Sequence, residues 1–248
     1  MSIGRRVYGL GAAAMGATTV AFQVLAPAHP PAHDTLAYAE AAALILGGLA
    51  VNLPRVSAAG AALLAAYFAL SAVILAGPVV VAKPLVVGSW EDFAELAALS
   101  MGGVVAYALV PNALAGGTAA LVRAGRMAFG LCLLVFGAAH FAYAKYTASL
   151  VPAWLPPGQM AWCYITGVAQ IAAGLAMLSG IQARLAAILL TIMYGLFGVL
   201  VHAPLIHASP HVRFYWDEFF ENLALMGVAW TMADAIARGH ERINNKLG

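Results

Sequence analysis

Five ionisable side chains lie inside long apolar segments of this sequence: Glu40, Glu95, His140, His202 and Glu221. An ionisable residue at membrane depth is a functional candidate by default, because burying its charge without a partner is costly. All five fall in the half of their segment that faces the same side of the membrane. This shared depth predicts one polar site, in which a Glu221–His140 pair would hold a proton donor beside an acceptor near neutral pH.

Polar and aromatic residues at helical spacing extend the candidate site. His140 and Tyr143 are three residues apart and would share a helix face, and Asn222 adds an amide next to Glu221. We expect Glu221 to matter more for activity than Glu95, which lies 126 residues before it at the equivalent place in a similar motif. The full expectation is a catalytic set of His140, Glu221 and His202, with substrate contacts from Tyr143, Tyr164, Trp162, Tyr194, Asn222, Glu40 and Glu95.

These residues also have a purely structural interpretation. A histidine in a membrane helix often bonds a neighbouring helix, and Glu95 and Glu221 could reach the headgroups by snorkelling. The motifs Trp90-Glu91-Asp92 and Trp216-Asp217-Glu218 open two apolar segments. Tryptophan suits the interface there, and acids in the first turn complement the helix dipole. Glu95 and Glu221 lie one turn deeper, and capping does not explain them.

Three histidines near the seventh apolar segment raise the question of a metal. His202, His207 and His211 are separated by Pro204 and Pro210, so they do not fall on one uninterrupted helix. His207 and His211 are four residues apart, but Pro210 lies between them, so they do not form the uninterrupted helical His-x-x-x-His core that would support them as ligands. We therefore expect no metal site.

The composition places these residues in a membrane protein. Of the 248 residues, 63% are hydrophobic and 9% are charged, whereas soluble domains carry about 25% charged residues. This balance excludes a soluble enzyme, a disordered protein and a nucleic-acid binder. At about 20 residues per crossing, we expect an all-α membrane protein with eight transmembrane helices. Their approximate limits are 7–26, 36–53, 57–77, 91–111, 127–150, 160–179, 183–203 and 216–237, with 112–122 as a connector or an interfacial helix.

The distribution of basic residues predicts the orientation. Nine of the twelve lysines and arginines fall on the side that would hold both termini, and Lys83, Lys145 and Arg213 fall on the other. The positive-inside rule then places both termini in the cytoplasm, with the protein in the cell (inner) membrane.

A comparison of the sequence with itself gives one clear offset, of 126 residues. Pro78 and Pro84 fall on Pro204 and Pro210, and the two tryptophan-acidic motifs coincide. Four spans per copy predict two parallel repeats related by an axis along the membrane normal. We assign 1–122 to a degenerate, scaffold-like first repeat and 123–248 to a second repeat that carries the site and a short polar cytoplasmic tail.

The repeat also bears on the N-terminus. Arg5-Arg6, an apolar run and Ala26-Pro27-Ala28 together resemble a signal peptide. Because this segment is the counterpart of the fifth span, we expect an uncleaved first helix.

The second half resembles the DoxX-like membrane proteins. The resemblance rests on three stretches, Gly137–Phe141, Val151–Pro156 and Thr166–Gly174, which match a histidine in the first span, a Val-Pro-x-x-Leu-Pro loop and a Gly-bearing second span. The resemblance implies a four-helix unit and a link to redox metabolism, with a quinone as the associated molecule. Cys132 and Cys163 depart from the thiol-redox relatives, since we expect them too far apart in depth for a disulfide.

Three functional interpretations follow. The first is a redox-associated protein that binds a quinone or another small lipophilic substrate in an outer-leaflet pocket. If it is an enzyme, we expect a quinone-linked oxidoreductase component, and another redox subunit is a candidate partner. The second is a proton-coupled carrier of a small solute, suggested by the repeat and the buried carboxylates. The third is a non-catalytic assembly subunit of a membrane complex.

The expected topology can be tested by labelling. Single cysteines at Ala32 or Ser209 should react with an impermeant thiol reagent in intact cells, because both positions fall in expected external loops. A cysteine at Ala124 should not react, because its loop is expected in the cytoplasm. Labelling at Ala124 would overturn the orientation, and an intact mass short of the full 248 residues by a leader peptide would contradict the uncleaved first helix.

Overall fold

The computed structural model describes residues 2–25, 31–111 and 118–247, and all regular structure in these ranges is helical. Residues 26–30, which hold the expected first separator, lie outside the described residues. The helices are α1 (Ile3–Leu25), α2 (Pro31–Val51), α3 (Ser57–Ser71), η1 (Ala72–Ala76), α4 (Gly77–Ala82), α5 (Val87–Ala108), α6 (Thr118–Ala142), α7 (Ala144–Leu150), α8 (Gln159–Ser179), α9 (Ala183–Phe197), η2 (Gly198–His202), α10 (Ala203–Ala208) and α11 (Arg213–Leu247).

Four helical stretches are long and apolar enough to cross a membrane. They are Ser57–Ala82, Thr118–Ala142, Gln159–Ser179 and Ala183–Ala208. The other long helices are less uniformly apolar, since α5 and α11 carry the acidic motifs and α1 begins with Arg5 and Arg6. The structure is therefore that of an all-helical protein compatible with a membrane.

Several of the expected boundaries differ from those in the structure, including the end of the eighth segment, expected at 237, because α11 continues to Leu247. The fifth segment, expected as one helix over 127–150, is broken at Tyr143, whose backbone leaves the helical region (φ −114°, ψ 30°). The helix before this break begins at Thr118, so the end of the expected connector 112–122 is helical, and residues 112–117 lie outside the described residues. This helix runs through residue 122, at which the sequence divides the two repeats.

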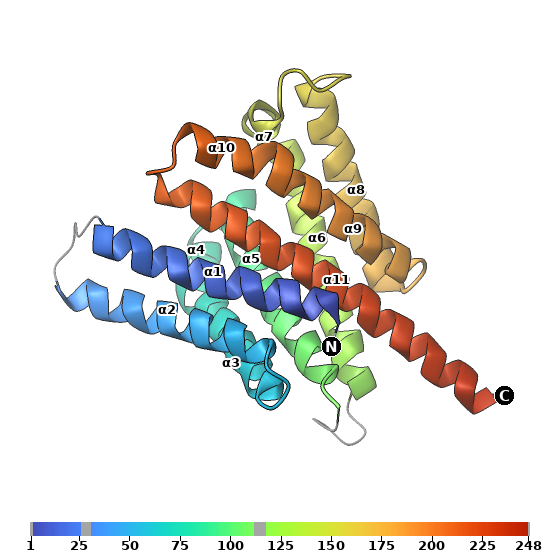
Figure 1. Ribbon diagram of the computed structural model, residues 1–248. Coiled ribbons are helices and arrows are strands. Elements are labelled where there is room, and N and C mark those ends of the chain that lie inside the picture. The colour runs from blue at the N-terminus through green and yellow to red at the C-terminus, as the bar shows by residue number, and fades with distance from the viewer. Residues whose placement is uncertain (1, 26–30, 112–117, 248) are drawn as a thin grey trace.

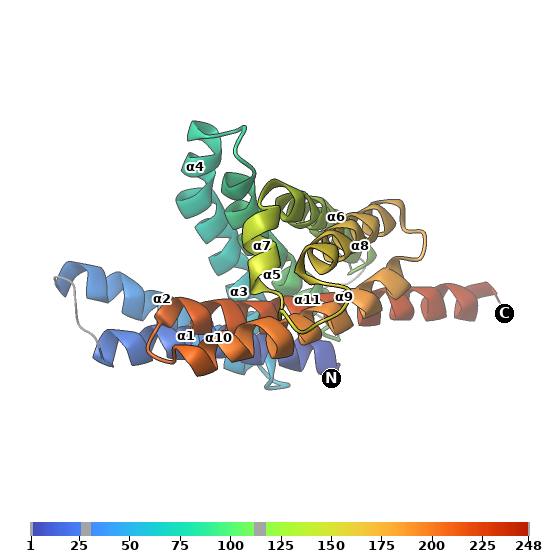
Figure 2. The same cartoon turned by 90° about the horizontal axis from the view of Figure 1, so that it is seen from above.

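The long helices pack around α11. Figure 1 shows α1 and α11 side by side across the front of the molecule, with α2 on one side and α9 with α10 on the other. Figure 2, turned by 90°, shows α5 and α6 behind this group. The contacts agree with both views, because α11 packs against α1, α5 and α9, and α5 packs against α6. Residues 213–247 form the longest helix, and its C-terminal part extends beyond the bundle.

Two segments 126 residues apart have the same unusual helical form. Ser57–Ala82 and Ala183–Ala208 each contain an α-helix, then one π-helical turn, then a short α-helix, with every boundary displaced by 126 residues. A proline follows each π turn, Pro78 in α4 and Pro204 in α10. A proline removes an N–H and crowds the carbonyl four residues earlier, and a helix relieves this by widening locally. His202 lies in the second of these turns.

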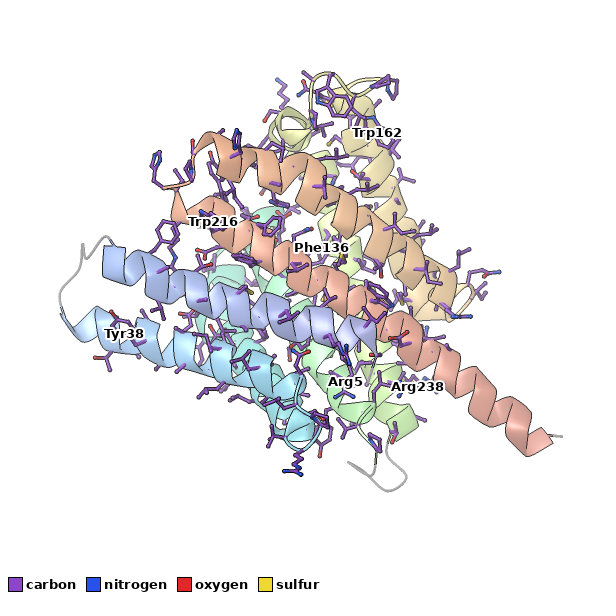
Figure 3. The ribbon with its side chains drawn as sticks, in the orientation of Figure 1. Arg5, Tyr38, Phe136, Trp162, Trp216 and Arg238 are labelled. Carbon is purple, nitrogen blue, oxygen red and sulfur yellow. The ribbon has the colours of Figure 1, made fainter. Side chains whose placement is uncertain are left out.

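The crossing of α1 and α11 depends on glycines that allow the two backbones to touch. A Cβ added at Gly227 would collide with the backbone of Tyr8, and one added at Gly11 would lie 2.7 Å from the backbone nitrogen of Ala224. At the far end of this crossing, Arg5 and Arg238 lie near each other, whereas Tyr38 and Trp216 lie toward the opposite end (Figure 3). The small residues therefore set how closely the first and last long helices approach.

We predict that G227A lowers the stability of the protein. The added methyl must push α1 away from α11, which should cost about 1–3 kcal/mol, as overpacking of a core does. The measurement is the thermal unfolding midpoint of the purified protein in detergent, which should fall by several degrees. The matched control is G239A on the same helix, where an added Cβ meets no atom within 4 Å. An equal loss of stability in both variants would contradict the role given to the close contact.

Candidate functional site

A cavity of about 560 Å³ lies among α5, α6, α7, α8, α9, η2 and α11. Its lining is mostly apolar, and its polar side chains come from several helices. Those polar and ionisable side chains are Glu91, Glu95, His140, Thr147, Trp162, Cys163, Thr166, Gln170, Tyr194, His202, Glu218, Glu221 and Asn222. An apolar cavity with a few converging polar groups is the usual form of a small-molecule site.

Most of the residues expected from the sequence lie on the wall of this cavity. His140, His202, Glu221, Asn222, Trp162, Tyr194 and Glu95 all line it. Because Glu95 comes from α5 and Glu221 from α11, both halves of the chain contribute a carboxyl to the same space. The carboxyls of Glu91 and Glu218 line it as well, and the greater importance of Glu221 over Glu95 stays a prediction.

Matching turns hold the helices that carry these carboxyls. The Trp90 indole donates a hydrogen bond to the carbonyl oxygen of Pro84 at 2.9 Å, and the Trp216 indole donates to that of Pro210 at 2.9 Å. Each bond ties the first turn of α5 or α11 to the loop before it. One turn further in, the carboxyls of Glu95 and Glu221 lie close enough to interact electrostatically.

His140 is oriented by its own helix. Its Nδ1 lies 2.8 Å from the carbonyl oxygen of Phe136, and since a carbonyl only accepts, Nδ1 carries the proton. In the neutral ring the other nitrogen, Nε2, is then left as an acceptor. The backbone oxygen of His140 also accepts a hydrogen bond from the Cys163 thiol at 3.3 Å, which joins α6 to α8.

Three buried polar atoms on the wall have no hydrogen-bond partner within the described residues. They are Oε1 of Gln170, the hydroxyl of Tyr194 and Oε1 of Glu221. Gln170 and Tyr194 are each only 3% exposed, so bulk water does not reach these atoms freely. A buried polar atom without a partner costs about 1–3 kcal/mol. A ligand that bonds these atoms would recover that cost.

Three expected site residues lie outside the cavity. The expectation that Tyr143 and Tyr164 share it is wrong: both line a separate shallow depression beside Phe141 and Lys145. The Tyr143 hydroxyl instead accepts a hydrogen bond from the backbone N–H of Gly88 at 2.9 Å, and the Tyr164 ring stacks on that of Phe141. The helix break at Tyr143 removes the shared face with His140 on which the expectation depended.

Glu40 is the third of these residues. It is exposed on α2, beside Tyr67, and does not line the cavity. The depth that the sequence predicts for Glu40 therefore does not bring it to the wall that holds the other four ionisable groups.

Sequence reasoning also missed several wall residues, above all Gln170. Trp162, Thr166 and Gln170 follow one another at four-residue spacing and form one stripe on α8, which begins beside Trp162 (Figure 3). Trp162 is an expected site residue, and this spacing is the signal that could have added Thr166 and Gln170. Glu91 and Glu218, interpreted as capping acids, line the cavity as well.

Large apolar side chains form the outer rim of the cavity. We call Ile165, Leu189, Ile192 and Leu196, from α8 and α9, the apolar rim; each lines the cavity and is between 48% and 55% exposed. Such side chains are unfavourable in water and suited to contact with lipid chains. Within the described ranges, no three metal-ligating side chains come together in a way that could hold an ion.

Comparisons with known proteins give one family match. A family model described as a domain of unknown function (DUF8561) matches residues 129–213, about a third of the chain, and its description is not that of the DoxX-like family. No curated protein and no solved structure matches the chain. The matched segment extends from within α6 to the first residue of α11, so it includes His140, Gln170 and His202 but neither Glu95 nor Glu221.

Proposed function

We propose that this chain is an integral membrane protein that binds a small lipophilic molecule in the cavity. The observation that carries the proposal is the combination of an apolar cavity with buried, unpartnered polar atoms at Gln170, Tyr194 and Glu221. The half-exposed apolar rim supports access from the bilayer rather than from water. A molecule that dissolves in lipid and carries one polar end would satisfy both features.

The architecture that we propose is eight spans in two parallel four-helix repeats. The recurrence of the π turn at Ala72–Ala76 and Gly198–His202, and of the Trp–Pro bonds at Trp90 and Trp216, supports a duplication with an offset of 126 residues. The pattern of packing supports it too: α1 packs on α2 and α3 on α5, as α6 packs on α8 and α9 on α11. We further propose that both termini are cytoplasmic and that the protein lies in the inner membrane, from the distribution of basic residues.

A quinone is the ligand of this class that the resemblance to DoxX-like proteins suggests. His202 and the hydroxyl of Tyr194 are hydrogen-bonding groups that could contact its carbonyl oxygens, and Glu95 or Glu221 could exchange protons with its reduced form. The second candidate is a proton-coupled carrier, which is favoured by the contribution of one carboxyl from each half.

We predict that filling the cavity wall removes the bound molecule. Ala169 on α8 is exposed and lines the cavity, so A169W should place an indole beside the rim and reduce co-purifying lipophilic ligand at least fivefold. The measurement is mass spectrometry of extracts from gently purified protein, with quinones among the compounds quantified. The control is A172W, also an exposed alanine on α8 but absent from the cavity wall, which should retain the ligand.

The outcomes separate the candidate functions. A quinone depleted only in A169W supports the quinone interpretation. Substrate-dependent proton uptake into liposomes, abolished by A169W and not by A172W, supports the carrier. Equal ligand content in the wild type and both variants contradicts a binding function for the cavity and leaves an assembly subunit.

A further inference from the structure

The cavity has an unbalanced set of charges. Glu91, Glu95, Glu218 and Glu221 all line it, and no lysine or arginine does. Over the ranges that the structure describes, the ion pair present joins Arg213 to Asp217, so none of the four cavity carboxyls has a basic partner. Several partly buried carboxyls without counter-charge are costly in a medium of low polarity, and an added positive charge would relieve that cost.

The hydrogen-bonding groups of the wall are unbalanced in the same direction, because most of the donors are already used. Asn222 donates to the backbone oxygen of Tyr194 at 2.8 Å, and the Trp162 indole donates to that of Pro156 at 2.8 Å. Thr166 donates to the backbone oxygen of Trp162 at 2.8 Å, and Nδ1 of His140 to that of Phe136.

The buried atoms that remain without a partner are mainly acceptors. Oε1 of Gln170 accepts, Oε1 of Glu221 accepts when the carboxyl is ionised, and the Tyr194 hydroxyl can accept or donate. A ligand that offers N–H donors therefore matches the wall better than one that offers carbonyl oxygens.

Aromatic rings near the carboxyls favour the same kind of ligand. Phe136, Tyr194 and Phe197 line the cavity, and the rings of Tyr194 and Phe197 meet edge to face with centroids 6.2 Å apart. The face of an aromatic ring attracts a cation, and the attraction is stronger where water is excluded.

We infer that the molecule bound in this cavity is a lipophilic amine in its protonated form, with the ammonium group at Glu95 and Glu221 and the apolar body directed toward the apolar rim. The inference rests on the proposed function, since it names the chemical class of the ligand for the same cavity. The ammonium supplies up to three N–H donors for the acceptors of the wall. Its charge compensates the carboxyls that α5 and α11 bring together.

The test compares three probes of similar size and shape that differ in charge. They are 4-phenylbutylamine, 4-phenylbutanol and 4-phenylbutyrate, titrated by calorimetry into the full-length protein in lipid nanodiscs, with empty nanodiscs subtracted. The amine should bind at least tenfold more tightly than the alcohol, and the acid should bind most weakly. This comparison needs no variant, so it does not depend on a mutant that folds.

Variants then locate the charge that recognises the amine. E221Q and E95Q keep the shape of the side chain, and each should weaken amine binding at least tenfold while leaving alcohol binding within twofold. E40Q, which changes an exposed glutamate outside the cavity, should leave both affinities unchanged.

The inference and the proposed function fail in different ways. The assignment of an amine is overturned if the alcohol or the acid binds as tightly as the amine. It is also overturned if E40Q loses as much amine affinity as E221Q does. In either case the proposed function, binding of a small lipophilic molecule, still stands. If the ligand lost in A169W is a quinone, the assignment of an amine is overturned and the proposed function is not. If none of the three probes binds, and A169W and A172W carry the same ligand content, the proposed function fails as well.

Discussion

The packing of α11 against α5 places Glu95 and Glu221 beside the same cavity, and the rest of the site depends on that contact. A glycine makes it close: a Cβ added at Gly102 on α5 would collide with Val228 on α11. Each carboxyl lies one turn beyond a tryptophan motif that begins its helix. Because carboxyls that share one apolar cavity without a counter-charge are unfavourable, this arrangement has a cost in stability. Such a cost at a cavity wall is typical of a site that binds something.

The two halves of the chain treat this region differently. Gln170 and Tyr194, whose buried polar atoms face the cavity, correspond at the offset of 126 residues to Leu44 and Phe68. Both counterparts are 1% exposed and belong to the hydrophobic core. At these two positions the first half has buried apolar side chains, whereas the second half has polar side chains that line the cavity. Fold maintenance alone does not require the polar residues, since the first half is helical at the same positions without them.

The sequence predicts the positions of the helices and the depth of the site, but not the direction in which each side chain points. Long apolar segments and prolines locate most helix ends to within about five residues, but α6 begins at Thr118 rather than at 127 and α11 ends at Leu247 rather than at 237. His140 and Glu221, expected at one depth, line one cavity. Depth as a criterion fails for Glu40, which is exposed outside the cavity, because depth does not say in which direction a side chain points. It also fails for Tyr143, because the spacing of three residues implies a shared face only while the helix continues.

The direction of side chains is hard to predict here for a physical reason. A helix in a soluble protein has one polar and one apolar face, so the period of its sequence identifies the buried side. In a membrane both the lipid-facing and the protein-facing sides are apolar, and the period carries little information. Only polar residues at helical spacing mark the inward face, as Trp162, Thr166 and Gln170 do on α8. That stripe lines the same cavity as the carboxyls of α5 and α11, and the exposed side chain of Ile165 on the same helix forms part of the apolar rim. The single helix α8 therefore contributes both an apolar side chain to the rim of the cavity and polar side chains to its wall.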